Sequence, residues 1–414
     1  MGVTVAITRV ACETDAAPNT QDITTADLGD LTPKAAIFIV SYAVTDGIAA
    51  SDAIMSIGAA TGTSNRWAVC GIDEDNLDTS DTEGFVDLTH CIYLEDNGGV
   101  DGSADLDSFI ENGVRIAWDN APSSAYLLTV ILFAGSDLSA HAGNQVILTE
   151  NNAYDITDPG FEPNDVFVVA GKNNSGHWDY SSGLGLVHND GEGGITQRAI
   201  SKFWRNAVGT SDTAARNTNS GGALRCKYDG ALDWYAEFSD FDANGFSITP
   251  RNDSADNTQM CYLALNYNGA VSSWVGTHTT PTSGGNNSEE GPGFTPQFVL
   301  ILVNLAEAID TAYTDNRGGS FGIAVFDADN EYCTTVSAED NQDTTDTQSL
   351  SDDRAIVIPD DDGTLDIEAS FVSFDANGWT VNYTNVPATA KVLPALAIEA
   401  EAAPAARRIF ITHT

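Results

Sequence analysis

Apolar and polar residues alternate in short runs along the whole chain. Residues 1–9 alternate as a strand does, and residues 125–135 form the longest apolar run. In the last third, runs of strand length are separated by Gly, Asp and Asn turns, at 298–303, 320–326, 332–336, 355–358, 365–374, 379–383 and 392–399. No sustained helical periodicity interrupts them. This pattern predicts an all-β protein built from evenly spaced short strands.

Three markers recur in the same order. They are a proline before an apolar strand, an aspartate within a Thr/Ser-rich tetrad, and a glycine that closes an Asn-Gly turn behind an aromatic residue. The proline occurs at 33, 163 and 296, the aspartate at 81, 212 and 346, and the glycine at 113, 245 and 378. Because the three markers keep one register, we infer three tandem copies of one unit of about 130 residues, a typical domain size.

The strand pattern of each copy predicts a β-sandwich of the jelly-roll type. The expected domains are residues 1–140, 141–276 and 277–414, the last with an extra C-terminal strand. Residues 136–144 and 277–293 are predicted to be linkers because of their polar composition. Two arrangements stay open at this stage, an elongated rod and a compact cluster with pseudo-three-fold symmetry.

The chain is strongly acidic. Asp and Glu number 60 against 17 Lys and Arg, a formal net charge of −43. Such a field repels phosphate groups, so neither nucleic acid nor a membrane is an expected partner, and no apolar run reaches the ~20 residues of a membrane-spanning helix. At molar salt the screening length falls to about 3 Å. The composition therefore favours a protein that works in brine over an ordinary acidic protein. Separately, the first residues lack the pattern of a secretory signal.

Candidate catalytic groups show no catalytic spacing. The histidines are His90, His141, His177, His188, His278 and His413, and the cysteines are Cys12, Cys70, Cys91, Cys226, Cys261 and Cys333. Neither set forms an HExxH or CxxC pattern, and no nucleophile elbow or phosphate-binding loop occurs. The sequence thus predicts no catalytic residues, no zinc site, and thiols that are buried or idle. Among 60 carboxylates, no glycosidase pair can be singled out.

An oxygen-rich loop near the end of the third copy is the best metal candidate. Asp360 and Asp362 precede Gly363, and Asp366 follows. Such a set suits Ca²⁺ or another hard cation in a structural role. The alternative is an Asp-Gly hairpin turn that needs no ion. No other cofactor is expected.

A polar loop unique to the second copy is the best ligand candidate. It contains Asn174, Trp178 and Tyr180, an aromatic pair beside an amide group. A loop that only one copy carries is a place for specialised binding, and this composition suits a host surface glycan. The alternative is a packing role for Trp178. The Thr/Ser-Asp-Thr tetrads are interpreted as turns stabilised by their own side chains.

The proline-led strand, the [ST][ST]DT turn and the FDANG turn together resemble a β-sandwich unit of virion proteins from tailed viruses of marine and saline habitats. The resemblance extends over nearly the whole chain, and the first copy departs most, with FIENG at 109–113. It implies a non-enzymatic structural part of a virion.

Within the virion, the resemblance implies a structural or host-contacting part, such as a head decoration, turret, tail or fibre component. The acidic composition adds a halophilic, haloarchaeal host, and we expect a capsid decoration or turret component that is assembled in the host cytoplasm. The expected partners are capsid or tail subunits and further copies of the chain. The alternatives are a tail-fibre or receptor-binding lectin-like protein that attaches to host surface glycans, and a polysaccharide-degrading enzyme.

Overall fold

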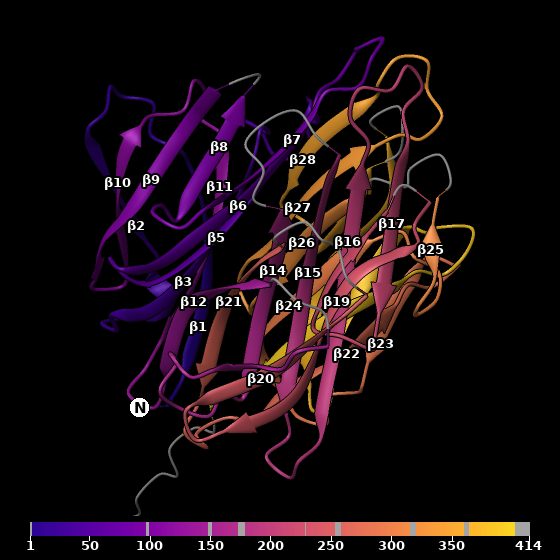
Figure 1. Ribbon diagram of the computed structural model, residues 1–414. Coiled ribbons are helices and arrows are strands. Elements are labelled where there is room, and N and C mark those ends of the chain that lie inside the picture. Colours follow the sequence, from indigo (N-terminus) through magenta and orange to yellow (C-terminus); the bar gives the residue numbers. More distant parts are fainter. Residues whose placement is uncertain are drawn as a thin grey trace, which may run out of the picture.

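The protein is all-β, as the computed structural model shows for residues 2–96, 99–147, 151–172, 179–227, 229–252, 258–314, 320–359 and 364–401 (Figure 1). The first repeat contains β1 (Thr4–Ala11), β2 (Asn19–Thr24), the 3₁₀ helix η1 (Ala26–Leu28), β3 (Pro33–Ser41), β4 (Ala50–Ser51), β5 (Ala53–Gly62), β6 (Asn65–Asp73), β7 (Thr82–Asp87), β8 (Ile92–Asp96), β9 (Gly99–Ile110), β10 (Gly113–Asn120) and β11 (Leu127–Ala134). Within the described ranges, no helix is long and apolar enough to cross a lipid bilayer.

The second and third repeats follow the same order. The second contains β12 (Ser139–Ile147), β13 (Tyr154–Ile156), β14 (Asp165–Lys172), β15 (Tyr180–Asn189), β16 (Ile195–Trp204), β17 (Thr213–Thr218), β18 (Ala223–Cys226), β19 (Leu232–Asp242), β20 (Gly245–Arg251) and β21 (Thr258–Asn266). The third contains β22 (Ser273–Thr279), β23 (Gly285–Glu289), β24 (Pro296–Asn304), β25 (Ala312–Tyr313), β26 (Phe321–Phe326), β27 (Glu331–Ala338), β28 (Thr347–Asp352), β29 (Ile356–Pro359), β30 (Leu365–Asp375), β31 (Gly378–Asn385) and β32 (Val392–Glu399).

Each repeat is a sandwich of a larger and a four-stranded antiparallel sheet. In the first repeat the orders are β1-β11-β3-β5-β6-β7 and β2-β10-β9-β8, and both other repeats reproduce them with equivalent strands. The larger sheets of the second and third repeats gain a short strand from a neighbouring repeat. β25 of the third repeat pairs with β17, and β4 of the first pairs with β28. Strand pairing therefore joins the second repeat to the third and the third to the first, in addition to side-chain packing.

Two segments that composition predicted as linkers are strands, so that prediction was wrong. β12 pairs along its whole length with β21, and β22 pairs with β32, so the second and third repeats begin at these strands. β23 lies inside the other predicted linker and pairs with β31. These edge strands bury only some of their side chains, which lets polar residues and glycine occupy the rest.

The three larger sheets face one another around a common core, which decides between a rod and a cluster. One hydrophobic cluster includes Ile37 of the first repeat, Leu184 of the second and Ile323 of the third. Each sandwich has a core of its own besides this one. Strands such as β3 bury both faces, since Ile37 points into the common core and Phe38 into the sandwich core. The molecule is a compact cluster with pseudo-three-fold symmetry.

Candidate functional site at the pseudo-three-fold axis

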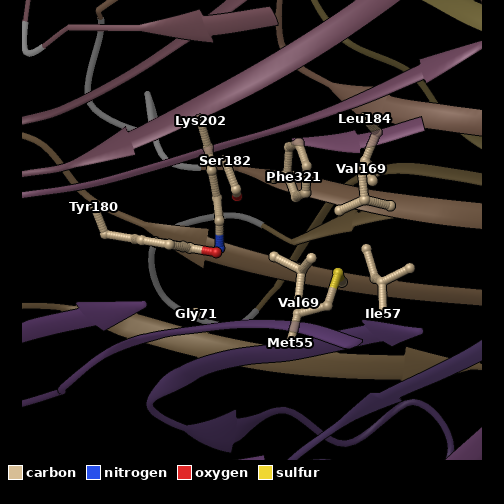
Figure 2. Close-up of a pocket in the computed structure, with 10 residues that line it drawn as sticks. All are labelled: Met55, Ile57, Val69, Gly71, Val169, Tyr180, Ser182, Leu184, Lys202 and Phe321. Carbon is tan, nitrogen blue, oxygen red and sulfur yellow. The ribbon is translucent and has the colours of Figure 1, made fainter. Parts of the chain in front are cut away.

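A small cavity lies where the three larger sheets meet. It has a volume of about 10 Å³, room for about one water molecule. Side chains from all three repeats surround it (Figure 2), and its lining comprises Met55, Ile57, Val69, Gly71, Val169, Tyr180, Ser182, Leu184, Lys202 and Phe321. Because the first, second and third repeats all contribute, the cavity marks the pseudo-three-fold axis.

Lys202 points into this cavity from β16 (Figure 2). The residue is 2% exposed, and its Nζ has no hydrogen-bond partner among the described residues. Nζ lies 3.1 Å from the centroid of the Trp204 ring and 5.3 Å from that of Phe321. The ring faces attract a cation, but burial dominates and lowers the pKa of Lys202 well below its ordinary value. Burial therefore favours the neutral form of this amine.

Asp73 is a second buried ionisable group near the axis, at the end of β6. Its Oδ1 accepts no hydrogen bond from the described residues. Burial raises the pKa of Asp73 well above its ordinary value, and the positive charge of Lys202 opposes that rise. Burial thus favours the neutral form of both groups, because a charge is poorly solvated in the interior.

The axis is symmetric in backbone but not in side chains. Three residues occupy equivalent positions in the three repeats: Gly71, Lys202 and Val336. Each pairs across the larger sheet with an equivalent residue of the preceding long strand, which is Met55, Ser182 or Phe321 in turn. Gly71 leaves a space that the second repeat fills. These unlike residues make the packing of each repeat at the axis different.

Tyr180 was predicted to bind a ligand, and the structure places it in the interior. Its side chain is 3% exposed and lines the axial cavity. The reason is that β15 begins at Tyr180 and carries it directly into the interior. The other two residues of that predicted site, Asn174 and Trp178, lie outside the described residues.

The predicted cation loop is only partly within the described residues. Asp360 and Asp362 lie outside them. Asp366 lies on β30, half-buried. The calcium site therefore stays a prediction.

The three Thr/Ser-Asp-Thr tetrads connect the repeats in a closed ring. In the first tetrad the backbone N of Ser80 donates to Val208 O at 2.9 Å, its carbonyl accepts from Ala207 N at 2.8 Å, and its Oγ donates to Arg205 O at 2.7 Å. All three partners belong to the second repeat. We call each such set of contacts an inter-repeat clasp.

The second clasp repeats this geometry between the second and third repeats. Ser211 N donates to Gln342 O at 2.9 Å, and Ser211 Oγ donates to Glu339 O at 2.7 Å while accepting from Gln342 N at 2.9 Å.

The third clasp joins the third repeat to the first. Thr345 N donates to Leu77 O at 2.9 Å and Thr345 Oγ1 accepts from Leu77 N at 2.9 Å. The tetrads were interpreted as supports for their own turns. They instead fasten each repeat to the next.

A separate group lies on the outer sheet of the first repeat. His90, Asp105 and Asp119 each place one possible ligand atom within 4.8 Å of the others. Sequence spacing did not indicate it because the three residues come from three strands or their ends, and only the sheet brings them together.

The side chains at the axis pack the three repeats together, and the ionisable groups there are buried. The amine of Lys202 faces a cavity of about 10 Å³, which is too small for a substrate. Comparison with models of protein families finds no match to this chain, and comparison with curated protein sequences finds none either.

Proposed function

We propose that the protein is a non-enzymatic structural component of the virion of a tailed virus with a halophilic host. It is exposed on the particle surface as a capsid decoration or turret component. The observation that carries this proposal is the closed ring of three clasps around one shared core. One chain thereby forms a rigid body with pseudo-three-fold symmetry.

Such a body fits a symmetric shell. Assemblies place subunits on symmetry axes, and a partner with matching symmetry can contact three neighbours through three similar surfaces. A single chain with three similar outer faces suits the local three-fold positions of an icosahedral capsid. Capsid subunits, and further copies of this chain, are the partners that the proposal names.

The charge supports an exposed place in brine. The net charge of −43 is spread over the repeats, and most side chains of the common core are apolar. At high ionic strength the acidic surface is screened and stays hydrated, so the particle exterior remains soluble.

The proposal is tested on purified virions of a virus that encodes the chain. Gold-labelled antibodies against the protein should decorate the capsid, and a cryo-EM map should show a three-lobed density on local three-fold positions. Label confined to the tail would replace the decoration role by a fibre or receptor-binding role. Absence from virions, or release of reducing sugars from host polysaccharide by the purified chain, would overturn the proposal.

A further inference from the structure

His90, Asp105 and Asp119 form a candidate metal site on the outer sheet of the first repeat. His90 lies just before β8, Asp105 lies on β9 and Asp119 on β10, and their ligand atoms lie within 4.8 Å of one another. Imidazole nitrogen and carboxylate oxygen are ordinary Zn²⁺ ligands, with bonds of about 2.0 to 2.2 Å to a common ion. The group needs only small side-chain adjustments to enclose one.

Asp87 orients the imidazole of His90. Its Oδ2 lies 3.0 Å from His90 Nδ1, and its Oδ1 accepts from the backbone N of His90 at 2.9 Å. A carboxylate on Nδ1–H favours the tautomer in which Nε2 carries a lone pair, the arrangement found behind metal-bound histidines. Nε2 lies 3.3 Å from Asp119 Oδ2. Two acceptors at this distance require a proton or a metal ion between them.

Asp105 forms an ion pair with Arg66. Arg66 Nη2 donates to Asp105 Oδ2 at 3.1 Å, whereas the Nε–H of Arg66 donates to the carbonyl of Thr89. Asp105 Oδ1 also lies 2.8 Å from Arg66 Nε, so Arg66 neutralises this carboxylate. When His90 is neutral, the group carries two net negative charges. Three come from the carboxylates of Asp87, Asp105 and Asp119, and the guanidinium of Arg66 offsets one of them. One divalent cation would balance the remainder.

The second repeat supplies a protein cation at the same place. By the spacing of the glycine markers, Glu237 and Arg251 correspond to Asp105 and Asp119, and Arg251 Nη2 lies 2.8 Å from Glu237 Oε2. The residue that corresponds to His90 there is Gly221. Where the second repeat pairs an arginine with a carboxylate, the first has a second carboxylate and a histidine.

We propose that the first repeat binds one divalent transition-metal ion, represented by Zn²⁺, through His90 Nε2 and one carboxylate oxygen each of Asp105 and Asp119. A water molecule completes the coordination. The imidazole favours this class of ion over Ca²⁺, which prefers oxygen ligands alone.

The test is isothermal titration calorimetry of the metal-free full chain with ZnCl₂ in molar KCl, which screens diffuse binding to the acidic surface. One Zn²⁺ should bind per chain. H90Q should weaken binding by about 100-fold or more and D119N by about 10-fold or more, in the range known for altered metal sites. The matched control is H141Q, because His141 Nε2 pairs with Asp158 at 3.1 Å but belongs to no such group among the described residues.

Co²⁺ absorption adds a readout of coordination. Titration with CoCl₂ should produce visible bands in the wild type and in H141Q but not in H90Q. Thermal melts of the metal-free variants establish that each one folds. No Zn²⁺ binding up to millimolar concentration, or binding that H90Q and D119N leave unchanged, would overturn the proposal.

Discussion

The ring of Tyr180 in the second repeat occupies the space in front of Gly71 in the first. A Cβ on Gly71 would lie 2.0 Å from Cε1 of Tyr180, and a Cβ on Gly84 would lie 1.8 Å from the same ring. We therefore expect Gly71→Ala to lower the free energy of unfolding by about 1 to 3 kcal/mol or more, as overpacking does. Urea denaturation at constant KCl measures the change.

The control for this variant is Gly62→Ala, because no atom lies within 4 Å of a Cβ built on Gly62. A second control is the double variant Gly71→Ala/Tyr180→Ala, in which the added methyl group should cost much less than in the wild type. Equal losses for Gly71→Ala and Gly62→Ala would contradict the packing described for the axis.

Lys202→Met should stabilise the protein. The wild-type chain buries an amine that has no hydrogen-bond partner among the described residues. Replacing a buried ionisable group by an apolar one of similar volume is often favourable by about 1 to 4 kcal/mol. Denaturant unfolding at pH 7 measures the gain, and Lys227→Met is the control, since the Lys227 side chain is 52% exposed.

The gain should depend on pH in a definite direction. The folded protein lowers the pKa of Lys202, whereas the unfolded chain keeps a value of about 10.4. Between these two values the unfolded chain binds the extra proton, so wild-type stability rises with pH across this window. The advantage of Lys202→Met should therefore shrink as pH approaches 10. A difference that is constant from pH 7 to 10 would show that Lys202 is charged in the folded state.

The strand content and the triplication could be predicted because they depend on local pattern. The prolines start or precede strands β3, β14 and β24, and the glycine of each FDANG-type turn recurs for a steric reason. A Cβ on Gly245 would lie 1.9 Å from Ile156 O, and one on Gly378 1.8 Å from Glu289 O. The glycine therefore has a second role besides the hairpin turn that the sequence indicated: it lets a neighbouring strand approach closely.

The common core could also have been expected, but its side-chain chemistry could not. Runs such as 35–40 are apolar at every position, which fits a strand with two buried faces better than the outer strand of a lone sandwich. The meeting of Lys202 with Tyr180 and Gly71 depends on how repeats pack across the axis. No local pattern encodes the contact between Gly71 and Tyr180, which are 109 positions apart.

Ser211→Ala should weaken the clasp between the second and third repeats. The hydroxyl of Ser211 donates to Glu339 O and accepts from Gln342 N, and its removal leaves both backbone groups without these partners. Loss of a buried partner costs about 1 to 3 kcal/mol. Urea unfolding measures the loss. Ser108→Ala is the control, because the hydroxyl of Ser108 donates to the adjacent Asp107 at an exposed site. Equal stability of Ser211→Ala and wild type would contradict a fastening role for the tetrad.

Salt should raise the thermal stability of the whole chain. With a net charge of −43, like charges repel across the folded surface, and the screening length falls from about 10 Å at 0.1 M salt to about 3 Å at 1 M. We expect the unfolding midpoint to rise steeply over this range of KCl and to level off above it.

The double variant Asp107→Asn/Glu111→Gln removes two exposed charges from the first repeat and should unfold at higher temperature than wild type at 0.1 M KCl, with a smaller difference at 2 M. Sucrose, which strengthens burial without screening charge, is the control for general solvent effects. A midpoint that is insensitive to KCl, or a charge effect equal at both concentrations, would contradict adaptation of the surface to brine, because screening is the only term that changes with salt between the two variants.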